Sequence, residues 1–426
     1  MLKRSFLSLT KPRLKSPVLW TEASTAPLEM PAPQTGTFFF PQQGPLKDTL
    51  GLRPGDTIRT GQKLSSVLDD KRFLVSPLTG AIRAIDEYTG YMGQKYTSFA
   101  VDIKPEDEWD PGFGEKVDRG DFEGAVAYLS NLPGGDIFEP LAAVNDRTAT
   151  ILISALENDL FVANNRHALT GAADALKNGI AQLKGAAPSA KVLLAAPSDL
   201  GGTANRTGAE VHLVDPIYPE TLQPLLMRRL LGKSGGGAQA GSGSVFVTAD
   251  AVALLGEAFS LKRIPVYKVF SVFDKTMRPH QVKARIGTPI RHVLEVLQLS
   301  TEHGDRLISG GLMRGQTLFS EDFPILLSTT GLLLQDKSQV KSADDTHCVN
   351  CGECVRVCPA KIPVNMLVRF LENRLYDEAE RDWDLFSCIE CGLCSYVCIA
   401  HIPLFHYIML GKHEIAQMRG EEEAHA

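Results

Sequence analysis

The sequence predicts a multidomain α+β protein that ends in a small all-α module. Its 426 residues exceed a single typical domain of ~100–200 residues. Short β-like runs separated by turns fill residues 30–105, whereas strand-like and helix-like stretches alternate over residues 120–258. All eight cysteines fall between Cys348 and Cys398. These shifts in pattern divide the chain into four expected domains, at residues 30–105, 120–258, 262–305 and 335–415.

The composition excludes several functions. The net charge of -6 and the pI near 6.0 argue against nucleic acid as the main ligand. No window approaches the ~18 consecutive apolar residues of a membrane helix, and the N-terminus has no apolar run of signal-peptide length. Cysteines gathered in one region are typical of a metal site in a reducing compartment, so we expect a cytosolic chain.

The region 37–103 predicts an all-β domain. Turn signals such as Pro54-Gly55-Asp56 and Pro77-Leu78-Thr79-Gly80 separate its short strands. The spacing of these signals resembles a lipoyl-type barrel-sandwich hybrid, so we assign that fold to residues 30–105. Lys71 lies near the position of the modified lysine of lipoyl domains, but we interpret it as part of a charged, solvated turn.

The middle of the chain predicts an α/β domain followed by a smaller β-containing unit. The strand-like runs 150–153 and 191–196 flank an amphipathic stretch at 168–183, which favours parallel β-α-β units within 120–258. The Gly- and Ser-rich segment 234–244 is interpreted as a flexible loop. Farther on, a strand at 266–272 and a helix at 290–297 indicate a β-grasp-like unit over 262–305.

The strongest signal is a pair of cysteine runs, each spaced C-x2-C-x2-C-x3-C. In this pattern three thiolates hold three irons of one cube, and the fourth cysteine binds the neighbouring cube. We therefore predict two [4Fe–4S] clusters with exchanged ligands. The expected sets are Cys348, Cys351, Cys354 and Cys398 for the first cluster, and Cys388, Cys391, Cys394 and Cys358 for the second. Structural zinc sites also use C-x2-C pairs, but they do not explain why each run has a fourth cysteine that binds the neighbouring site.

Residues around the two runs fit this interpretation. Gly352 and Gly392 are expected at tight turns, and Pro359 is expected to end a helix. Residues 364–374 predict a helical spacer between the runs. Four aromatic residues are interpreted as a dry wall around the clusters: Phe370, Trp383, Phe386 and Tyr396.

In order, these parts resemble the RnfC family, the C subunits of Rnf-type ferredoxin:NAD⁺ ion-translocating electron transport complexes. The resemblance covers nearly the whole chain and includes the segment RIGTPIRHVLEVL, which is similar to an SLBB β-grasp unit. It implies that residues 120–258 are similar to the NADH-dehydrogenase flavoprotein subunit, which holds FMN and NADH. It also implies an oxidoreductase and translocase subunit, peripheral on the cytoplasmic face of the membrane. Such a subunit relays electrons between NADH or a redox protein and the membrane subunits.

The resemblance is imperfect at the flavin loop. The family's glycine-rich loop lines up with residues 132–140, where Gly134, Gly135 and Phe138 match, and Glu157 matches in the second motif. These four residues are the candidate FMN and NADH contacts. Asp136 and Glu139 would repel a phosphate, which favours weakened or lost flavin binding. Whether FMN and NADH still bind, and whether the chain itself oxidises NADH, stays open.

Two alternatives remain beside the membrane-complex interpretation. One is a soluble iron–sulfur reductase of the same lineage, similar to cobalamin reductase. The other is an iron–sulfur adaptor whose α/β domain only supports the clusters and docks a partner. No residue is assigned a catalytic role in any of these interpretations.

Overall fold

The computed structural model describes residues 12–15, 26–42, 50–69, 72–232, 243–340 and 347–425. Lys71 and most of the 234–244 segment lie outside the described residues. The chain forms two compact units. One contains the described parts of Met1–Lys15, Ile217–Gly237 and Ser338–Ala426, and is called the cluster unit below. The other contains the described parts of Ser16–Pro216 and Ala238–Lys337, and is called the main unit.

The main unit contains the α/β region that the sequence predicts. Its four-stranded sheet has the order β11-β10-β9-β13, and every neighbouring pair in it is parallel. The strands are β9 (Thr150–Ser154), β10 (Lys191–Pro197), β11 (Glu210–Val214) and β13 (Ser244–Thr248). The two strands expected near 150 and 191 are confirmed as neighbours, with Val192 opposite Ile151. Their runs of buried Val, Ile and Leu are typical of strands covered on both faces.

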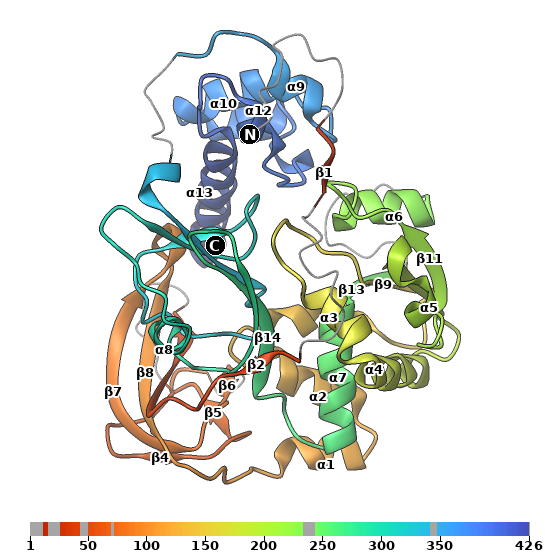
Figure 1. The fold of residues 1–426 in the computed structure, drawn as a ribbon, viewed down its shortest axis with the longest axis vertical. Coiled ribbons are helices and arrows are strands. Elements are labelled where there is room, and N and C mark those ends of the chain that lie inside the picture. Colours follow the sequence, from red (N-terminus) through yellow and green to blue (C-terminus); the bar gives the residue numbers. More distant parts are fainter. Residues whose placement is uncertain are drawn as a thin grey trace. The chain divides into compact units, whose positions relative to one another are not determined.

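Helices cover this sheet. The predicted helix at 168–183 is two helices, α3 (Asn164–Thr170) and α4 (Ala173–Ala186). Helix α4 packs closely on α7 (Ala249–Leu261), because Gly179 and Gly256 let the two backbones approach (Figure 1). A Cβ atom at Gly256 would lie 1.9 Å from the carbonyl oxygen of Ala175. The remaining short helices of this region are α1 (Gly112–Asp118), α2 (Phe122–Ser130), η2 (Gly135–Ala143), η3 (Ser198–Leu200) and α5 (Gly201–Ala204).

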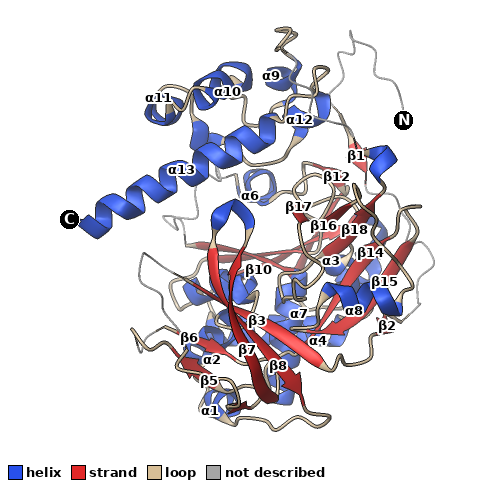
Figure 2. Cartoon of the chain, turned by 90° about the vertical axis from the view of Figure 1, so that its left-hand side faces the viewer, coloured by secondary structure: helices blue, strands red, loops and turns tan. Residues whose placement is uncertain are grey.

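The predicted all-β region forms antiparallel sheets. Strands β3 (Thr35–Pro41), β8 (Lys95–Ile103), β7 (Gly80–Thr89) and β4 (Thr57–Ile58) make one sheet in that order, and β3, β7 and β8 run side by side in Figure 2. Strands β5 (Lys63–Ser65) and β6 (Phe73–Val75) pair separately, and η1 (Tyr91–Gly93) connects β7 to β8. Phe38 and Phe99 stack inside this region with ring centroids 5.1 Å apart.

A third sheet is larger than the β-grasp unit expected over 262–305. It contains β14 (Tyr267–Phe273) and β15 (Pro279–Arg285), which are followed by helix α8 (Ile290–Val296). Its other strands come from outside that range: β2 (Leu28–Glu29), β16 (Arg306–Ser309), β17 (Gln316–Leu318) and β18 (Gly331–Gln335). The sheet extends because hydrogen bonding recruits strands that are distant in sequence, as when β15 pairs with β2 across more than 250 residues.

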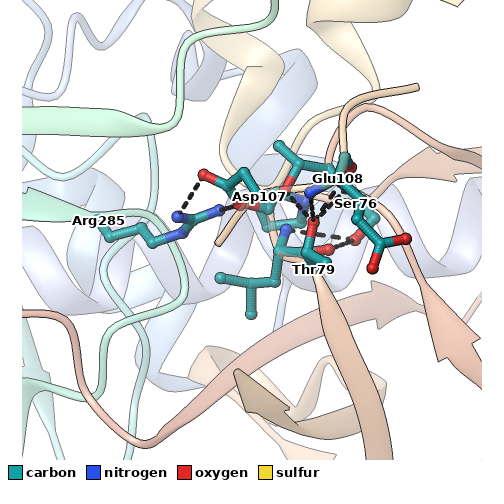
Figure 3. Close-up of polar contacts among 8 residues, drawn as sticks. Ser76, Thr79, Asp107, Glu108 and Arg285 are labelled. Atoms are coloured by element: carbon teal, nitrogen blue, oxygen red, sulfur yellow. Dashed lines mark hydrogen bonds and ion pairs between the residues drawn. The ribbon is translucent and has the colours of Figure 1, made fainter. Parts of the chain in front are cut away.

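An ion pair between a buried arginine and a half-buried aspartate connects this sheet to the all-β region. Arg285, at the end of β15, donates two hydrogen bonds to Asp107, at 2.6 Å and 2.8 Å (Figure 3). The same guanidinium reaches Thr60, whose hydroxyl also donates to Asp107. Burial alone would raise the pKa of Asp107, but the hydrogen bonds and charge of Arg285 lower it below its ordinary value.

The cluster unit is mainly helical. Its helices are α6 (Gln223–Leu231), α9 (Glu353–Val357), α10 (Val364–Glu372), α11 (Tyr376–Arg381), η5 (Leu385–Ser387), α12 (Leu393–Val397) and α13 (Leu404–His425) (Figure 1). The short helix η4 (Lys337–Gln339) precedes it. The expected spacer helix is confirmed as α10. Buried aliphatic residues including Leu367, Leu371 and Ile408 form the core together with the cysteines.

A two-stranded sheet belongs to the same unit. Strand β1 (Leu14–Lys15) pairs antiparallel with β12 (Ile217–Tyr218), so Leu14 lies opposite Tyr218. Residues 217–232 fall inside the stretch 120–258 that the sequence predicts as one domain, but they group with the cysteine-rich helices. The sequence pattern does not reveal this grouping, because it depends on contacts between distant segments.

Candidate iron–sulfur site

The two cysteine runs lie in a structural repeat. Each position in the first run has its counterpart 40 residues later, so Cys348 corresponds to Cys388. The predicted turn glycines have left-handed backbones, with φ of 73° at Gly352 and 69° at Gly392. Helices α9 and α12 begin directly after these glycines. Left-handed conformations also recur at the Asn350/Glu390 and Lys361/His401 pairs. The repeat therefore extends to the backbone dihedral angles.

The repeat also explains where the short helices end. Helix α9 ends at Val357, before Cys358 and Pro359. Helix α12 ends at the equivalent Val397, although Ile399 takes the place of the proline. Pro359 is thus compatible with the helix end but is not required for it.

Cysteines from both runs meet at one cavity. It has a volume of about 40 Å³ and is lined by Cys348, Cys351, Cys354 and Cys398, with Val368, Ile402 and Leu404 among its apolar walls. Three of these cysteines come from the first run and one from the end of the second. This is the mixed set that the sequence assigns to the first cluster.

The other four cysteines also lie near one another. Burial raises the pKa of the Cys391 thiol to about 11, and the nearby Cys388 and Cys358 thiols raise it as well. Burial, followed by the nearness of Cys388 and Cys391, raises the pKa of Cys394 too. Sulfur atoms in such surroundings remain thiolates only beside a strong positive charge. Cysteine thiolates are the donors that iron–sulfur clusters use, and a bound cluster would supply that charge.

The two cysteine sets differ in exposure. In the first set Cys348 is exposed, Cys351 and Cys398 are half-buried, and only Cys354 is buried. In the second set Cys358, Cys391 and Cys394 are all buried, and Cys388 is half-buried. The exposed side chains of Val349 and Ile399 lie beside the first cavity. The first set is thus the more accessible of the two.

Only two of the four aromatic residues assigned to a dry wall around the clusters pack against the core. Phe370 and Trp383 pack against the core of the cluster unit, with ring centroids 5.3 Å apart. Phe386 and Tyr396 are 47% and 52% exposed, so their assignment to a dry wall is wrong. Nearness along the chain does not indicate packing here, because the exposed Phe386 and Tyr396 are two residues from a cysteine, whereas Phe370 is 12 residues from Cys358.

Two polar residues at the second set were missed by the sequence reasoning. The buried hydroxyl of Tyr218 donates a 2.6 Å hydrogen bond to the carbonyl oxygen of Cys391, 173 residues away. Lys412, on α13, donates to the carbonyl oxygen of Cys388 at 2.8 Å and to Glu390 at 2.7 Å. Nothing in the sequence indicates the Tyr218 contact. Lys412 could have been suspected, since the repeat places it on the helix that follows the second run.

The candidate flavin loop lies in the main unit and is filled by the protein itself. A Cβ atom at Gly134 would come within 2.7 Å of the backbone nitrogen of Ser328, and one at Gly135 within 2.2 Å of the carbonyl oxygen of Leu129. Leu327 also donates a backbone hydrogen bond to Pro133. Phe138 is fully buried in the hydrophobic core. Gly134, Gly135 and Phe138 therefore pack the loop against the rest of the main unit.

A larger cavity of about 630 Å³ lies beside this loop. Its walls include aromatic rings such as Phe39 and Tyr96, together with Asp136 and Glu139. Burial raises the pKa of Asp136, and the neighbouring Glu139 raises it further. Arg72 also lines the cavity, but its guanidinium donates to the carbonyl oxygen of Pro41 and stacks on Phe40.

The second flavin-type motif binds backbone groups of the protein. Glu157 accepts a hydrogen bond from the backbone nitrogen of Arg166 at 2.8 Å. Burial raises its pKa to about 7, although the N–H groups of Arg166 and Asn165 act in the opposite direction. Asp159 accepts hydrogen bonds from the backbone nitrogens of Met313 and Arg314. Both carboxylates therefore accept hydrogen bonds from the protein's own backbone, Glu157 from helix α3 and Asp159 from residues 313–314.

These features do not fit an FMN phosphate. A phosphate site needs free backbone N–H groups and positive potential at close range. Here the two glycines meet the protein's own backbone, and the cavity beside them carries two carboxylates. The loop and its surroundings would therefore repel the phosphate that they would have to hold.

The cysteine arrangement defines the class of the C-terminal module, and a family model described as "4Fe-4S dicluster domain" matches residues 341–399. The chain as a whole is similar to the C subunits of ion-translocating oxidoreductase complexes. It is 25% identical to the C subunit of the Na(+)-translocating ferredoxin:NAD(+) oxidoreductase complex of Acetobacterium woodii, over 77% of this chain and 79% of that one. These matches confirm the resemblance to the Rnf-type subunit.

Two other relatives are longer than this chain. The C subunit of the ion-translocating oxidoreductase complex of Cronobacter sakazakii is 26% identical over 85% of this chain, and that of Klebsiella pneumoniae is 26% identical over 89%. The chain spans 50% and 54% of their respective lengths, about half in each case.

Among solved structures, a NAD+-reducing [NiFe]-hydrogenase in the air-oxidized state matches with a TM-score of 0.41 and 13% identity, over 65% of this chain and 53% of that one.

Within the residues that the structure describes, no helix is both long enough and apolar enough to span a bilayer.

Proposed function

We propose that this chain is an electron-transfer subunit of a membrane-associated, Rnf-type ion-translocating oxidoreductase complex. It would relay electrons one at a time between a redox partner, either NADH-linked or ferredoxin-linked, and membrane subunits of the complex. The observation that carries the proposal is the mixed set of Cys348, Cys351, Cys354 and Cys398 around one cavity. Similarity to the relatives from ion-translocating complexes along most of the chain supports it.

The residues proposed to hold the two [4Fe–4S] clusters are the two sets assigned from the sequence. Cys348, Cys351, Cys354 and Cys398 would bind one cluster, and Cys388, Cys391, Cys394 and Cys358 the other. When bound, such clusters supply one-electron transfer. The protein would contribute the tight turns, the apolar surroundings and the crossing of ligands, which hold the two sites close together.

We also propose the finer domain assignments. A barrel-sandwich hybrid at 30–105 is supported by the antiparallel sheet of β3, β4, β7 and β8. A flavoprotein-type domain at 120–258 is supported by the four parallel strands, and an SLBB unit at 262–305 by the β14–β15 pair followed by α8. The dicluster module would occupy 335–415, and the subunit would lie on the cytoplasmic face of the membrane.

The flavin-type loop is proposed to have lost FMN and NADH binding. The packing of Gly134 and Gly135 against the protein's own backbone, and the two acids beside them, support this view. On this basis a second candidate function is an iron–sulfur adaptor or reductase of the same lineage that receives its electrons from another protein. Gly134, Gly135, Phe138 and Glu157 would then be structural residues.

Anaerobic purification with quantified iron, sulfide and flavin tests these proposals. We expect about eight iron and about eight sulfide atoms per chain, as two four-iron cubes require, and no flavin. Zinc in place of iron, or a single cube, would contradict the cluster assignment. A yellow chromophore that NADH reduces would contradict the loss of flavin binding. Co-purification with membrane redox subunits from native membranes would favour the complex over the adaptor.

The exchange of ligands has a separate test. The variants Cys398→Ser and Cys348→Ser should disturb the same electron paramagnetic resonance signal, whereas Cys358→Ser should disturb the signal affected by Cys388→Ser. If Cys398→Ser instead acts on the same signal as Cys388→Ser, each run binds its own cluster and the crossed assignment fails.

A further inference from the structure

The second cysteine loop has a charged contact that the internal repeat does not duplicate in the first loop. Lys412 lies on α13, and its Nζ atom is 2.7 Å from a carboxylate oxygen of Glu390. The Lys412 side chain is 14% exposed and that of Glu390 is 30% exposed, so water screens this pair only partly. Glu390 lies between Cys388 and Cys391 and has a left-handed backbone, with φ of 57°.

The first loop serves as an internal comparison. The counterpart of Glu390 is the neutral Asn350, whose side-chain oxygen accepts a hydrogen bond from the exposed Arg369 at 2.5 Å. The counterpart of Lys412 is Glu372, which is exposed. The repeat thus conserves the backbone of the loop while changing the charges on it. The Glu390–Lys412 ion pair therefore has no equivalent at these two positions of the first loop, whose own half-buried ion pair, Glu353–Arg356, lies at other positions of the repeat.

Lys412 also binds the loop backbone. Its Nζ atom donates to the carbonyl oxygen of Cys388 at 2.8 Å, so one ammonium group contacts both a proposed ligand residue and the acidic residue beside it. Because the amine is nearly enclosed, its charge acts on the cysteine site through a medium of lower dielectric than water. The negative charge of Glu390 acts on the same site with opposite sign.

We propose that Lys412 and Glu390 set the reduction potential of the second cluster, with Lys412 as a charge-compensating positioning residue. This inference rests on the proposed function, since it requires that the second set binds a cluster. One-electron reduction adds a negative charge to a cluster, and a nearby cation stabilises that charge while a nearby carboxylate opposes it. Lys412 therefore raises the potential of the second cluster, and Glu390 lowers it.

The test is a redox titration of the full-length protein with dithionite, followed by electron paramagnetic resonance. Three variants are compared with the unmodified chain: Lys412→Gln, Glu390→Gln and the double variant. The signal of the second cluster is identified as the one that Cys391→Ser alters. Arg419→Gln is the matched control, because Arg419 is a cation on the same helix that pairs with Glu380 and is 56% exposed.

We expect Lys412→Gln to shift the midpoint of the second cluster downwards and Glu390→Gln to shift it upwards. The double variant should return close to the original value, and Arg419→Gln should leave it unchanged. The first cluster should keep its midpoint in all four. A Lys412 that merely holds the loop would give shifts of the same sign in both single variants, or none, and either result overturns the inference.

The iron content distinguishes failure of the proposed function from failure of this inference alone. If the unmodified protein lacks a second four-iron cluster, the proposed function has failed. If both clusters are present but Glu390→Gln does not move the second midpoint upwards, only this inference has failed. Should Lys412→Gln lose iron from the second site, the Glu390→Gln titration alone decides, since that variant keeps the lysine contact to the carbonyl oxygen of Cys388.

Discussion

At the scale of single residues, the acidic side chains of the main unit show why chemical type alone does not establish a ligand site. Glu157 matches a flavin-type motif, yet its carboxylate accepts a hydrogen bond from the Arg166 backbone and has a pKa raised to about 7. Asp107 belongs to no motif, yet it pairs with the buried Arg285. Burial and partners decide what each carboxylate does.

The raised pKa of Glu157 predicts a pH dependence of stability. Its folded pKa is about 7 and its unfolded value about 4.5, so the folded state binds more protons between these pH values. Stability from this group is therefore present below about pH 4.5 and lost as the pH rises through 7. Glu157→Gln should raise the thermal midpoint relative to the unmodified chain at pH 8 more than at pH 5. An equal change in thermal midpoint at pH 5 and pH 8 would contradict the raised pKa of Glu157.

The Arg285–Asp107 pair predicts a large loss of stability. Arg285→Ala would leave the Asp107 carboxylate without its main partner, at a cost of about 3–5 kcal/mol in the free energy of unfolding. The lowered pKa of Asp107 means that its stabilisation is present above the unfolded value near 4 and lost as the pH falls below it.

Urea denaturation at pH 7 measures this loss. Arg83→Ala is the control, since the Arg83–Asp102 pair is 3.8 Å apart and mostly exposed, and such pairs contribute about 0–1 kcal/mol. Comparable losses for both variants would contradict a special role for Arg285.

At the scale of secondary-structure elements, helix α4 has two glycines that the sequence does not distinguish. Gly179 faces α7, where a Cβ atom would lie 2.0 Å from the carbonyl oxygen of Val252, whereas Gly185 has nothing within 4 Å. One glycine is needed for close packing of two helices, and the other only weakens its helix. The difference depends on the partner helix.

Two substitutions test this contrast, one at Gly256, which faces Gly179 across the α4–α7 contact, and one at Gly185, which lies away from it. Gly256→Ala, on α7, should destabilise the main unit by about 1–3 kcal/mol, because the new methyl group overlaps the Ala175 carbonyl oxygen. Gly185→Ala should stabilise it by about 0.5–1 kcal/mol, since alanine favours the helix and meets no obstacle. Circular dichroism melting curves of both variants provide the measurement. A neutral Gly256→Ala would mean that the helices can separate at little cost.

At the scale of the whole molecule, the cluster unit is assembled from three separate parts of the sequence. Strand β12 and helix α6 come from residues 217–237, and β1 from the N-terminal part. Tyr218 then reaches the carbonyl oxygen of Cys391. We therefore infer that residues 335–415, the range expected from the sequence as a domain, omit part of their own support.

This assembly predicts that the excised fragment 335–426 binds its second cluster less firmly than the full chain does. Within the full chain, Tyr218→Phe should destabilise the cluster unit by about 1–3 kcal/mol, because it leaves the buried Cys391 carbonyl oxygen without this donor. The measurements are the rate of iron loss to a chelator without oxygen and the thermal midpoint. Tyr267→Phe, at a phenol on the exposed surface of the main unit, is the control. Equal iron-loss rates for fragment and full chain would contradict the inference.

The sequence by itself determined the features that depend on local spacing. The C-x2-C-x2-C-x3-C runs predict two crossed cysteine sets, of which the first lines one cavity. The alternation of strands and helices predicted the parallel neighbours β9 and β10. Turn geometry at Gly352 and Gly392 was also predictable, because a left-handed backbone strongly favours glycine. These signals involve residues close together in the chain, or patterns with a fixed period.

Only the tertiary structure decided the rest. It paired β15 with β2, assigned residues 217–232 to the cluster unit, and brought Tyr218 and Lys412 to the second cysteine loop. It also showed that Gly134 and Gly135 pack against the protein's own backbone. The physical reason is the same throughout: a contact between distant segments depends on how complete elements pack, and a single sequence carries no local signal for that packing.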